Sequence, residues 1–70
     1  MIKVNDEIIY NEAEKSAKTS FIADTKSEVV PGATYVGFPE GYKIAFGSTC
    51  ITTSGDLAFM KSDGTWNWGD

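Results

Sequence analysis

Apolar and β-branched residues occur along this chain in short runs that alternate with polar positions, and Gly, Pro, Asn and Asp separate the runs. The pattern is clearest in the last third of the chain. There, runs at residues 49–53, 57–61 and 65–68 are separated by Ser54-Gly55-Asp56 and Ser62-Asp63-Gly64. Short strands joined by tight turns have this pattern. It predicts a three-stranded antiparallel meander.

The turn residues predict a register for this meander. Asp63-Gly64 suits a two-residue type I′ turn, in which both central residues need positive φ. Such a turn pairs Lys61 with Trp66 and Phe59 with Trp68. The predicted consequence is one shared face, which carries Leu57, Phe59, Trp66 and Trp68.

Two turns stay open at Gly55. A two-residue turn adds Cys50 and Thr52 to the tryptophan face, whereas a bulged three-residue turn moves the first strand over to the other face. With the two-residue turn, the reverse face carries Ile51, Ala58 and Met60 and is therefore partly apolar. We expect the N-terminal half to cover one side of the sheet and another subunit to cover the other.

The N-terminal half shows weaker signals of the same kind. Residues 2–4 and 7–10 flank Asn5-Asp6, which predicts a hairpin with Ile2 opposite Ile9. Residues 11–18 are polar and predict a turn or one helical turn. Further strands are expected at residues 19–23, 33–37 and 42–46, a solvated loop at residues 24–28, and a turn at Pro31-Gly32.

Composition supports a β-rich fold, because leucine occurs only at Leu57 whereas β-branched residues are frequent. We predict a single small domain over residues 1–70 that is all-β, or mainly β with one short helical turn, with an N-terminal hairpin and a C-terminal meander. Seventy residues bury a small core, and the lone Cys50 cannot form an internal disulfide. Oligomerisation is therefore the expected source of added stability.

Charge and residue content exclude several classes of function. Ten acidic residues against six basic ones give a net charge of -4, which disfavours binding to nucleic acid. No apolar run is long enough for membrane insertion. Without histidine, and with one cysteine, the common nucleophile pairs and transition-metal ligands are missing. We expect Asp56 and Asp63 to be turn residues, and we expect no enzyme activity, cofactor or metal.

Aromatic residues supply the candidate binding surface. Trp66 and Trp68 can form the core, anchor an interface, or stack on sugar rings beside Asn67 or Asp70. Lys61, opposite Trp66 in the predicted register, can make a cation–π contact or extend over the ring with its charge in water. The full candidate set for an interface or ligand platform is Trp66, Trp68, Phe59, Leu57, Tyr42 and Lys61.

Parts of residues 19–68 resemble small proteins from bacteriophage and prophage structural modules of Gram-positive bacteria. The resemblance rests on Ala23-Asp24-Thr25-Lys26, on Pro39-Glu40-Gly41 through Gly47-Ser48-Thr49-Cys50-Ile51, and on Gly55-Asp56-Leu57-Ala58-Phe59-Met60 through Asp63-Gly64-Thr65-Trp66. In those proteins a Gly-Ser start leads into strands that end in Gly-x-Trp. Trp66 matches that terminal tryptophan, whereas Trp68 is less typical of the pattern. The resemblance implies no catalytic residue.

The resemblance and the residue content together predict a non-enzymatic virion protein. We expect it to be made in the host bacterial cytoplasm and to reside in the virion, where it associates with itself or with a larger head or tail protein. The alternative is a module that binds carbohydrate or another component of the host surface through exposed aromatic residues.

Overall fold

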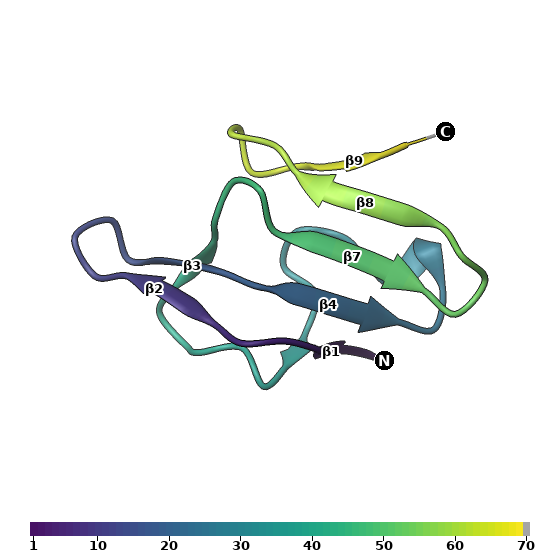
Figure 1. Ribbon diagram of the computed structural model, residues 1–70, viewed down its shortest axis with the longest axis horizontal. Coiled ribbons are helices and arrows are strands. Elements are labelled where there is room, and N and C mark those ends of the chain that lie inside the picture. Colours follow the sequence, from purple (N-terminus) through teal and green to yellow (C-terminus); the bar gives the residue numbers. More distant parts are fainter. Residues whose placement is uncertain (70) are drawn as a thin grey trace.

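The computed structural model describes residues 1–69, which form nine strands and one 3-10 turn. The six-stranded sheet has the order β5-β1-β4-β7-β8-β9 and contains β1 (Ile2–Val4), β4 (Ser20–Ala23), β5 (Tyr35–Val36), β7 (Thr49–Thr52), β8 (Leu57–Met60) and β9 (Trp66–Trp68) (Figure 1). The three-stranded sheet has the order β2-β3-β6 and contains β2 (Ile9–Asn11), β3 (Ser16–Lys18) and β6 (Lys43–Ile44). The predicted all-β class and the C-terminal meander are confirmed.

The two sheets share one continuous segment of chain, because Thr19 alone separates β3 from β4 (Figure 1). The Thr19 hydroxyl donates to the backbone oxygens of Glu7 (2.9 Å) and Asp6 (3.3 Å), and its N–H donates to the buried Ser48 hydroxyl (3.2 Å). These bonds satisfy the polar groups where the chain passes from one sheet to the other.

The N-terminal half contains a hairpin, but its strands differ from those predicted. β1 pairs with β4, with Ile2 opposite Ala23, so the predicted pairing of Ile2 with Ile9 is wrong. The pairing with β4 buries Ile2 in the core beside Phe21, and a local hairpin offers no comparable burial. Residues 12–15 form the turn that joins β2 to β3, and no helical turn forms there.

The six-stranded sheet curls around Phe21. The aromatic rings of Tyr35, Phe38 and Trp66 lie 5.1–6.0 Å from the Phe21 ring, measured between centroids. Tyr35 belongs to β5 and Trp66 to β9, which are the two edge strands of this sheet. The Trp66 Nε1–H donates to the Tyr35 hydroxyl (3.1 Å), so side chains of the two edge strands meet across the core.

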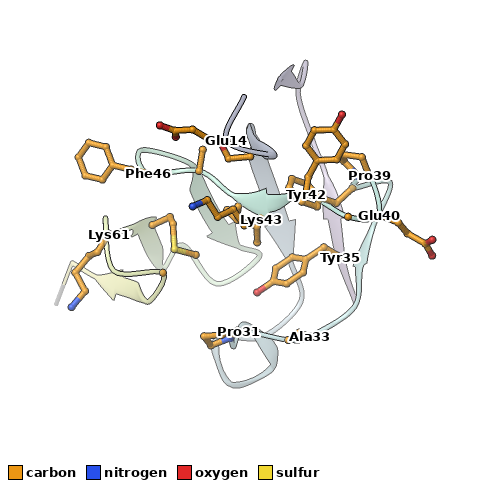
Figure 2. A pocket seen from close by; sticks show the side chains of 18 of the residues that line it. Glu14, Pro31, Ala33, Tyr35, Pro39, Glu40, Tyr42, Lys43, Phe46 and Lys61 are labelled. Atoms are coloured by element: carbon orange, nitrogen blue, oxygen red, sulfur yellow. The ribbon is translucent and has the colours of Figure 1, made fainter. Parts of the chain in front are cut away.

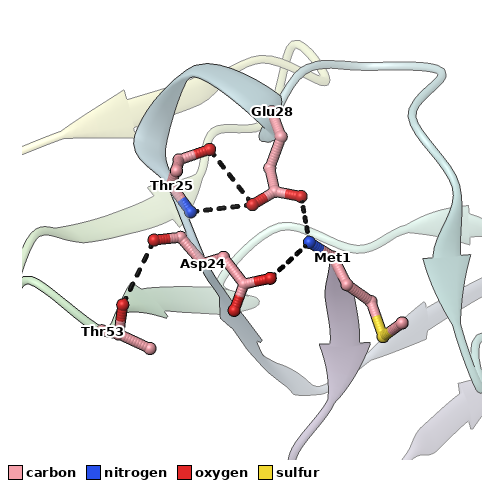
Figure 3. A network of polar contacts seen from close by, with 5 residues as sticks. All are labelled: Met1, Asp24, Thr25, Glu28 and Thr53. Atoms are coloured by element: carbon pink, nitrogen blue, oxygen red, sulfur yellow. Dashed lines mark hydrogen bonds and ion pairs between the residues drawn. The ribbon is translucent and has the colours of Figure 1, made fainter.

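One end of the curled sheet is closed by η1 (Lys26–Glu28) in the segment predicted as a solvated loop. The Glu28 carboxylate accepts the backbone N–H of Thr25 (2.7 Å) and its hydroxyl (3.1 Å), and it also forms an ion pair with the Met1 ammonium group (Figure 3). The same ammonium group lies 2.8 Å from an Asp24 carboxylate oxygen. These contacts fix η1 above the core, where the following residue, Val29, is buried.

Candidate functional site

The faces of the meander are set by two three-residue loops that end in glycine. In the first, the N–H of Gly55 donates to the Thr52 oxygen (3.0 Å) and the N–H of Thr52 donates to the Asp56 oxygen (2.9 Å). In the second, Gly64 and Lys61 form the same arrangement. Both glycines have positive φ, +95° and +88°, as expected for a type I turn followed by a G1 bulge. The bulged alternative at Gly55 is therefore the one that forms.

The second loop makes the predicted register of the tryptophans wrong. Met60 lies opposite Trp66 and Ala58 opposite Trp68, one residue away from the predicted pairs. Asp63 does not adopt positive φ, so the type I′ turn is absent. Instead its carboxylate accepts the hydroxyl (2.7 Å) and the N–H (3.0 Å) of Thr65, which lowers the pKa of Asp63 and stabilises the longer loop.

Trp66 and Trp68 consequently lie on the inner face of the sheet, away from Leu57 and Phe59. Trp66 packs edge-on against Phe21 at an interplanar angle of 85°. The ring of Trp68 lies 5.3 Å below the ammonium group of Lys26 in η1. Both indoles are half-buried and take part in core packing, and they do not form a flat exposed pair. Of the groups proposed to assist sugar binding beside them, Asn67 lies on the opposite face and Asp70 lies outside the described residues.

Leu57 and Phe59 lie on the opposite, outer face of the sheet. Ile51 of β7 lies between two apolar partners on this face. It pairs with Leu57 of β8 and with Ile22 of β4. Leu57 is 57% exposed, and Ile51 and Phe59 are each 43% exposed. We call the surface made by Ile22, Ile51, Leu57 and Phe59 the outer apolar patch. No other element of the described chain covers it.

Tyr42 and Lys61 line a third surface, an open groove of about 830 Å³ between the segment around residues 31–46 and the β8–β9 loop (Figure 2). Aromatic and aliphatic side chains contribute to its wall, and Lys43 lies near its centre in Figure 2. Its aromatic and lysine lining residues are Tyr35, Phe38, Tyr42, Lys43, Phe46 and Lys61.

Tyr42 is held in place by neighbours from the β2–β3 hairpin. Its hydroxyl donates to the Glu12 carboxylate, with 2.7 Å to each oxygen, and its ring packs edge-on against Tyr10. The ammonium group of Lys15 lies 5.3 Å from the ring centroid of Tyr42 and 3.3 Å from Glu12. The hydrogen bond lowers the pKa of Glu12 and raises the pKa of Tyr42.

Lys61 does not lie opposite Trp66 as predicted. It lies opposite Thr65, and its Nζ atom is 4.0 Å from an Asp63 carboxylate oxygen. The cation–π contacts found within residues 1–69 are instead those of Lys15 with Tyr42 and of Lys26 with Trp68.

Cys50 and the carboxylates of residues 1–69 belong to the side-chain types found in nucleophile and metal sites. Cys50 is fully buried, and burial raises the pKa of its thiol to about 11, so the nucleophilic thiolate is scarce at neutral pH. Within residues 1–69, no group of three or more carboxylate or cysteine side chains is close enough together to hold a metal ion. That same part of the chain has no helix with the length and hydropathy needed to cross a membrane.

Comparison of the chain with protein-family models, with curated proteins and with solved structures gave no match. The three surfaces described above are therefore the basis for functional argument. They separate the six predicted site residues into three pairs: Trp66 and Trp68 on the inner face, Leu57 and Phe59 on the outer apolar patch, and Tyr42 and Lys61 at the groove.

Sequence reasoning missed Tyr35, which links the core to the groove. Its hydroxyl donates to the Val30 oxygen (2.6 Å) and accepts the Trp66 N–H, and burial raises its pKa. The one available signal was the Pro31-Gly32 turn just before it, with Gly32 at φ +90°, which directs the chain back toward the core.

Proposed function

We propose that this chain is a non-enzymatic structural or accessory protein of a bacteriophage particle, where it acts by self-assembly or by docking on a larger head or tail protein. The resemblance of residues 19–68 to phage structural modules supports the phage assignment. Assembly is supported by the outer apolar patch, where three large apolar side chains are 43–57% exposed on neighbouring strands. Contiguous apolar surface of this kind marks interaction sites in soluble proteins.

The position of the patch favours contact with another protein over contact with a small molecule. Ile22, Ile51 and Leu57 lie in one row across three strands, and Phe59 lies in the next row. A regular sheet face with one side packed on the core presents a broad surface without a pocket. Protein interfaces use such surfaces, whereas small ligands bind in concave sites.

Light scattering over a concentration series tests self-assembly through the patch. We expect wild-type protein to show a mass above that of the 7.6 kDa chain, and Leu57→Lys to reduce that mass. Ile9→Lys is the matched control, because Ile9 is 63% exposed on the other sheet and should leave the mass unchanged. Wild-type protein that stays monomeric at every concentration would contradict self-assembly, and a mass insensitive to Leu57→Lys would contradict the patch.

A second candidate function, binding of carbohydrate at a host surface, is favoured by the groove. Tyr35, Phe38 and Tyr42 provide ring surfaces there, with Lys43 as a polar neighbour. Sugar sites combine aromatic faces with hydrogen-bonding groups in this way.

Titration with soluble cell-wall oligosaccharides, followed by NMR, tests sugar binding in the groove. The sugar should shift the resonances of groove residues, and Tyr42→Ala should weaken binding about tenfold. Phe59→Ala is the control, because Phe59 is an exposed aromatic residue that does not line the groove. Equal loss in both variants would oppose this function.

A further inference from the structure

β9 forms the edge of the six-stranded sheet, and within residues 1–69 no strand pairs with its outer side (Figure 1). Its three residues, Trp66, Asn67 and Trp68, carry no charge and include no proline. Natural proteins protect sheet edges with charged residues, with proline, with bulges or with very short strands. β9 lacks a charge or a proline and is the longer of the two edge strands of its sheet.

The hydrogen bonds to β8 determine which groups of β9 face outward. The N–H of Lys61 donates to the Thr65 oxygen (2.9 Å), and the N–H of Gly69 donates to the Leu57 oxygen (3.1 Å). In an antiparallel ladder, bonded pairs alternate with non-bonded pairs, so Asn67 and Phe59 form the bonded pair between these two. The backbone N–H and C=O groups of Trp66 and Trp68 therefore point away from β8.

We propose that a second copy of this chain pairs with β9 in antiparallel register, with Asn67 on the two-fold axis. This inference rests on the proposed assembly function and names one contact of that assembly. In this register Trp66 of each copy faces Trp68 of the other, and each such pair exchanges both of its N–H···O bonds. The pattern of outward groups on β9 is self-complementary, as a two-fold interface requires.

The side chains of β9 fit the same register. Trp66 and Trp68 are half-buried on the inner face, and across the axis each indole gains the other copy's indole as a neighbour. On the outer face the two Asn67 side chains meet at a non-bonded pair, where Cα atoms lie about 4.5 Å apart and amide groups can bond to one another. Phe59 lies beside Asn67, so the apolar patches of both copies continue across the axis.

The other sheet edges are less suited to pairing with a second copy. β5 and β6 have only two residues each, and β6 contains Lys43. β2 has three exposed residues, but Glu7 precedes it and Glu12 follows it. Glu12 is bonded there to the Tyr42 hydroxyl and paired with Lys15 of the same copy, so the chain next to β2 already makes contacts within the copy.

Amide hydrogen exchange of labelled protein at low and high concentration tests this contact directly. We expect the amide protons of Trp66 and Trp68 to exchange more slowly at high concentration. The Asn67 amide, bonded to Phe59 within each copy, is the internal reference and should not change with concentration. Exchange at Trp66 and Trp68 that is independent of concentration would overturn the proposal.

Charge substitution at the axis supplies an independent test. Asn67→Asp and Asn67→Lys each place like charges close together and should raise the dimer dissociation constant about tenfold. An equimolar mixture of the two variants should recover a dimer, because the charges across the axis are then opposite. If Leu57→Lys abolishes assembly while both Asn67 variants assemble as wild type does, the β9 contact is wrong and the proposed function stands. If wild-type protein is monomeric throughout, the β9 contact and self-assembly are both wrong, and docking on a larger protein is the part of the proposed function that stands.

Discussion

Glu28 illustrates how one partly buried side chain organises the end of this fold. Its carboxylate contacts Thr25 within the turn and the Met1 ammonium group from β1's end of the chain (Figure 3). The ion pair with the ammonium group is the main cause of the lowered pKa of Glu28, and the hydrogen bonds from Thr25 add to it. The pKa of the Met1 ammonium group is raised, mainly by Asp24 and then by Glu28.

These shifts predict a pH dependence of folding stability with two limbs. A lowered carboxylate pKa stabilises the fold above the ordinary pKa of glutamate, and this contribution is lost as the pH falls through the folded value. A raised ammonium pKa stabilises the fold below about pH 8, and this contribution is lost as the pH rises through the folded value. Stability should therefore be highest between about pH 5 and pH 8.

Urea unfolding of Glu28→Gln across pH checks this account. The variant should lose stability near neutral pH and show weaker pH dependence in both limbs, because its amide cannot form the ion pair. Glu14→Gln is the matched control, since the Glu14 side chain makes no ion pair or side-chain hydrogen bond within residues 1–69. A pH profile of Glu28→Gln that overlays the wild-type profile would show that the cluster contributes nothing.

At the scale of elements, the sequence located the strands better than it located their partners. The runs at residues 49–53, 57–61 and 65–68 became β7, β8 and β9 because alternating apolar residues need only one buried face. Register depends on turn length, and Asp63-Gly64 fits both a two-residue type I′ turn and the last two positions of a three-residue bulged loop. That one-residue ambiguity placed Trp66 and Trp68 on the wrong face.

Local sequence patterns did not predict which distant strands pair. Asn5-Asp6 predicts a tight turn, but β1 pairs with β4 because that pairing buries Ile2 against the core that Phe21 organises. A turn signal depends only on neighbouring residues, whereas the burial of a side chain depends on strands that are distant in the sequence. The candidate site was divided for the same reason, since its three surfaces lie on parts of the fold that only long-range pairing defines.

The bulged loop between β8 and β9 predicts that replacing Gly64 lowers stability. A Cβ atom there meets nothing within 4 Å, so Gly64→Ala introduces backbone strain at φ +88° without a clash. We expect a loss of about 1–2 kcal/mol in the free energy of unfolding, measured by urea denaturation. Gly69→Ala is the control, because its φ is not positive and its Cβ makes an ordinary 3.8 Å contact. Equal effects of the two substitutions would mean that Gly64 does not need positive φ.

At the scale of the whole molecule, the six-stranded sheet curls far enough for side chains of its two edge strands to meet. The contact between β5 and β9 passes through the Tyr35 hydroxyl, which bridges the Val30 oxygen and the Trp66 indole N–H. This bridge lies between the inner core around Phe21 and the groove, so it connects packing of the sheet to the shape of the groove wall. It also orients Trp66, a residue of the proposed β9 contact.

Tyr35→Phe removes this bridge while keeping the ring that packs 5.1 Å from Phe21. The partly buried Trp66 N–H then loses its partner, whereas the Val30 oxygen keeps the N–H of Ala33. The loss should cost about 1–3 kcal/mol of a total stability of about 3–10 kcal/mol. Tyr42→Phe removes an exposed hydroxyl bonded to Glu12 and should cost less stability than Tyr35→Phe, since water replaces the bond. Urea unfolding monitored by tryptophan fluorescence measures both. Equal losses would mean that the edges are held together by ring packing alone, and the hydroxyl bridge would then have no part in closing the sheet.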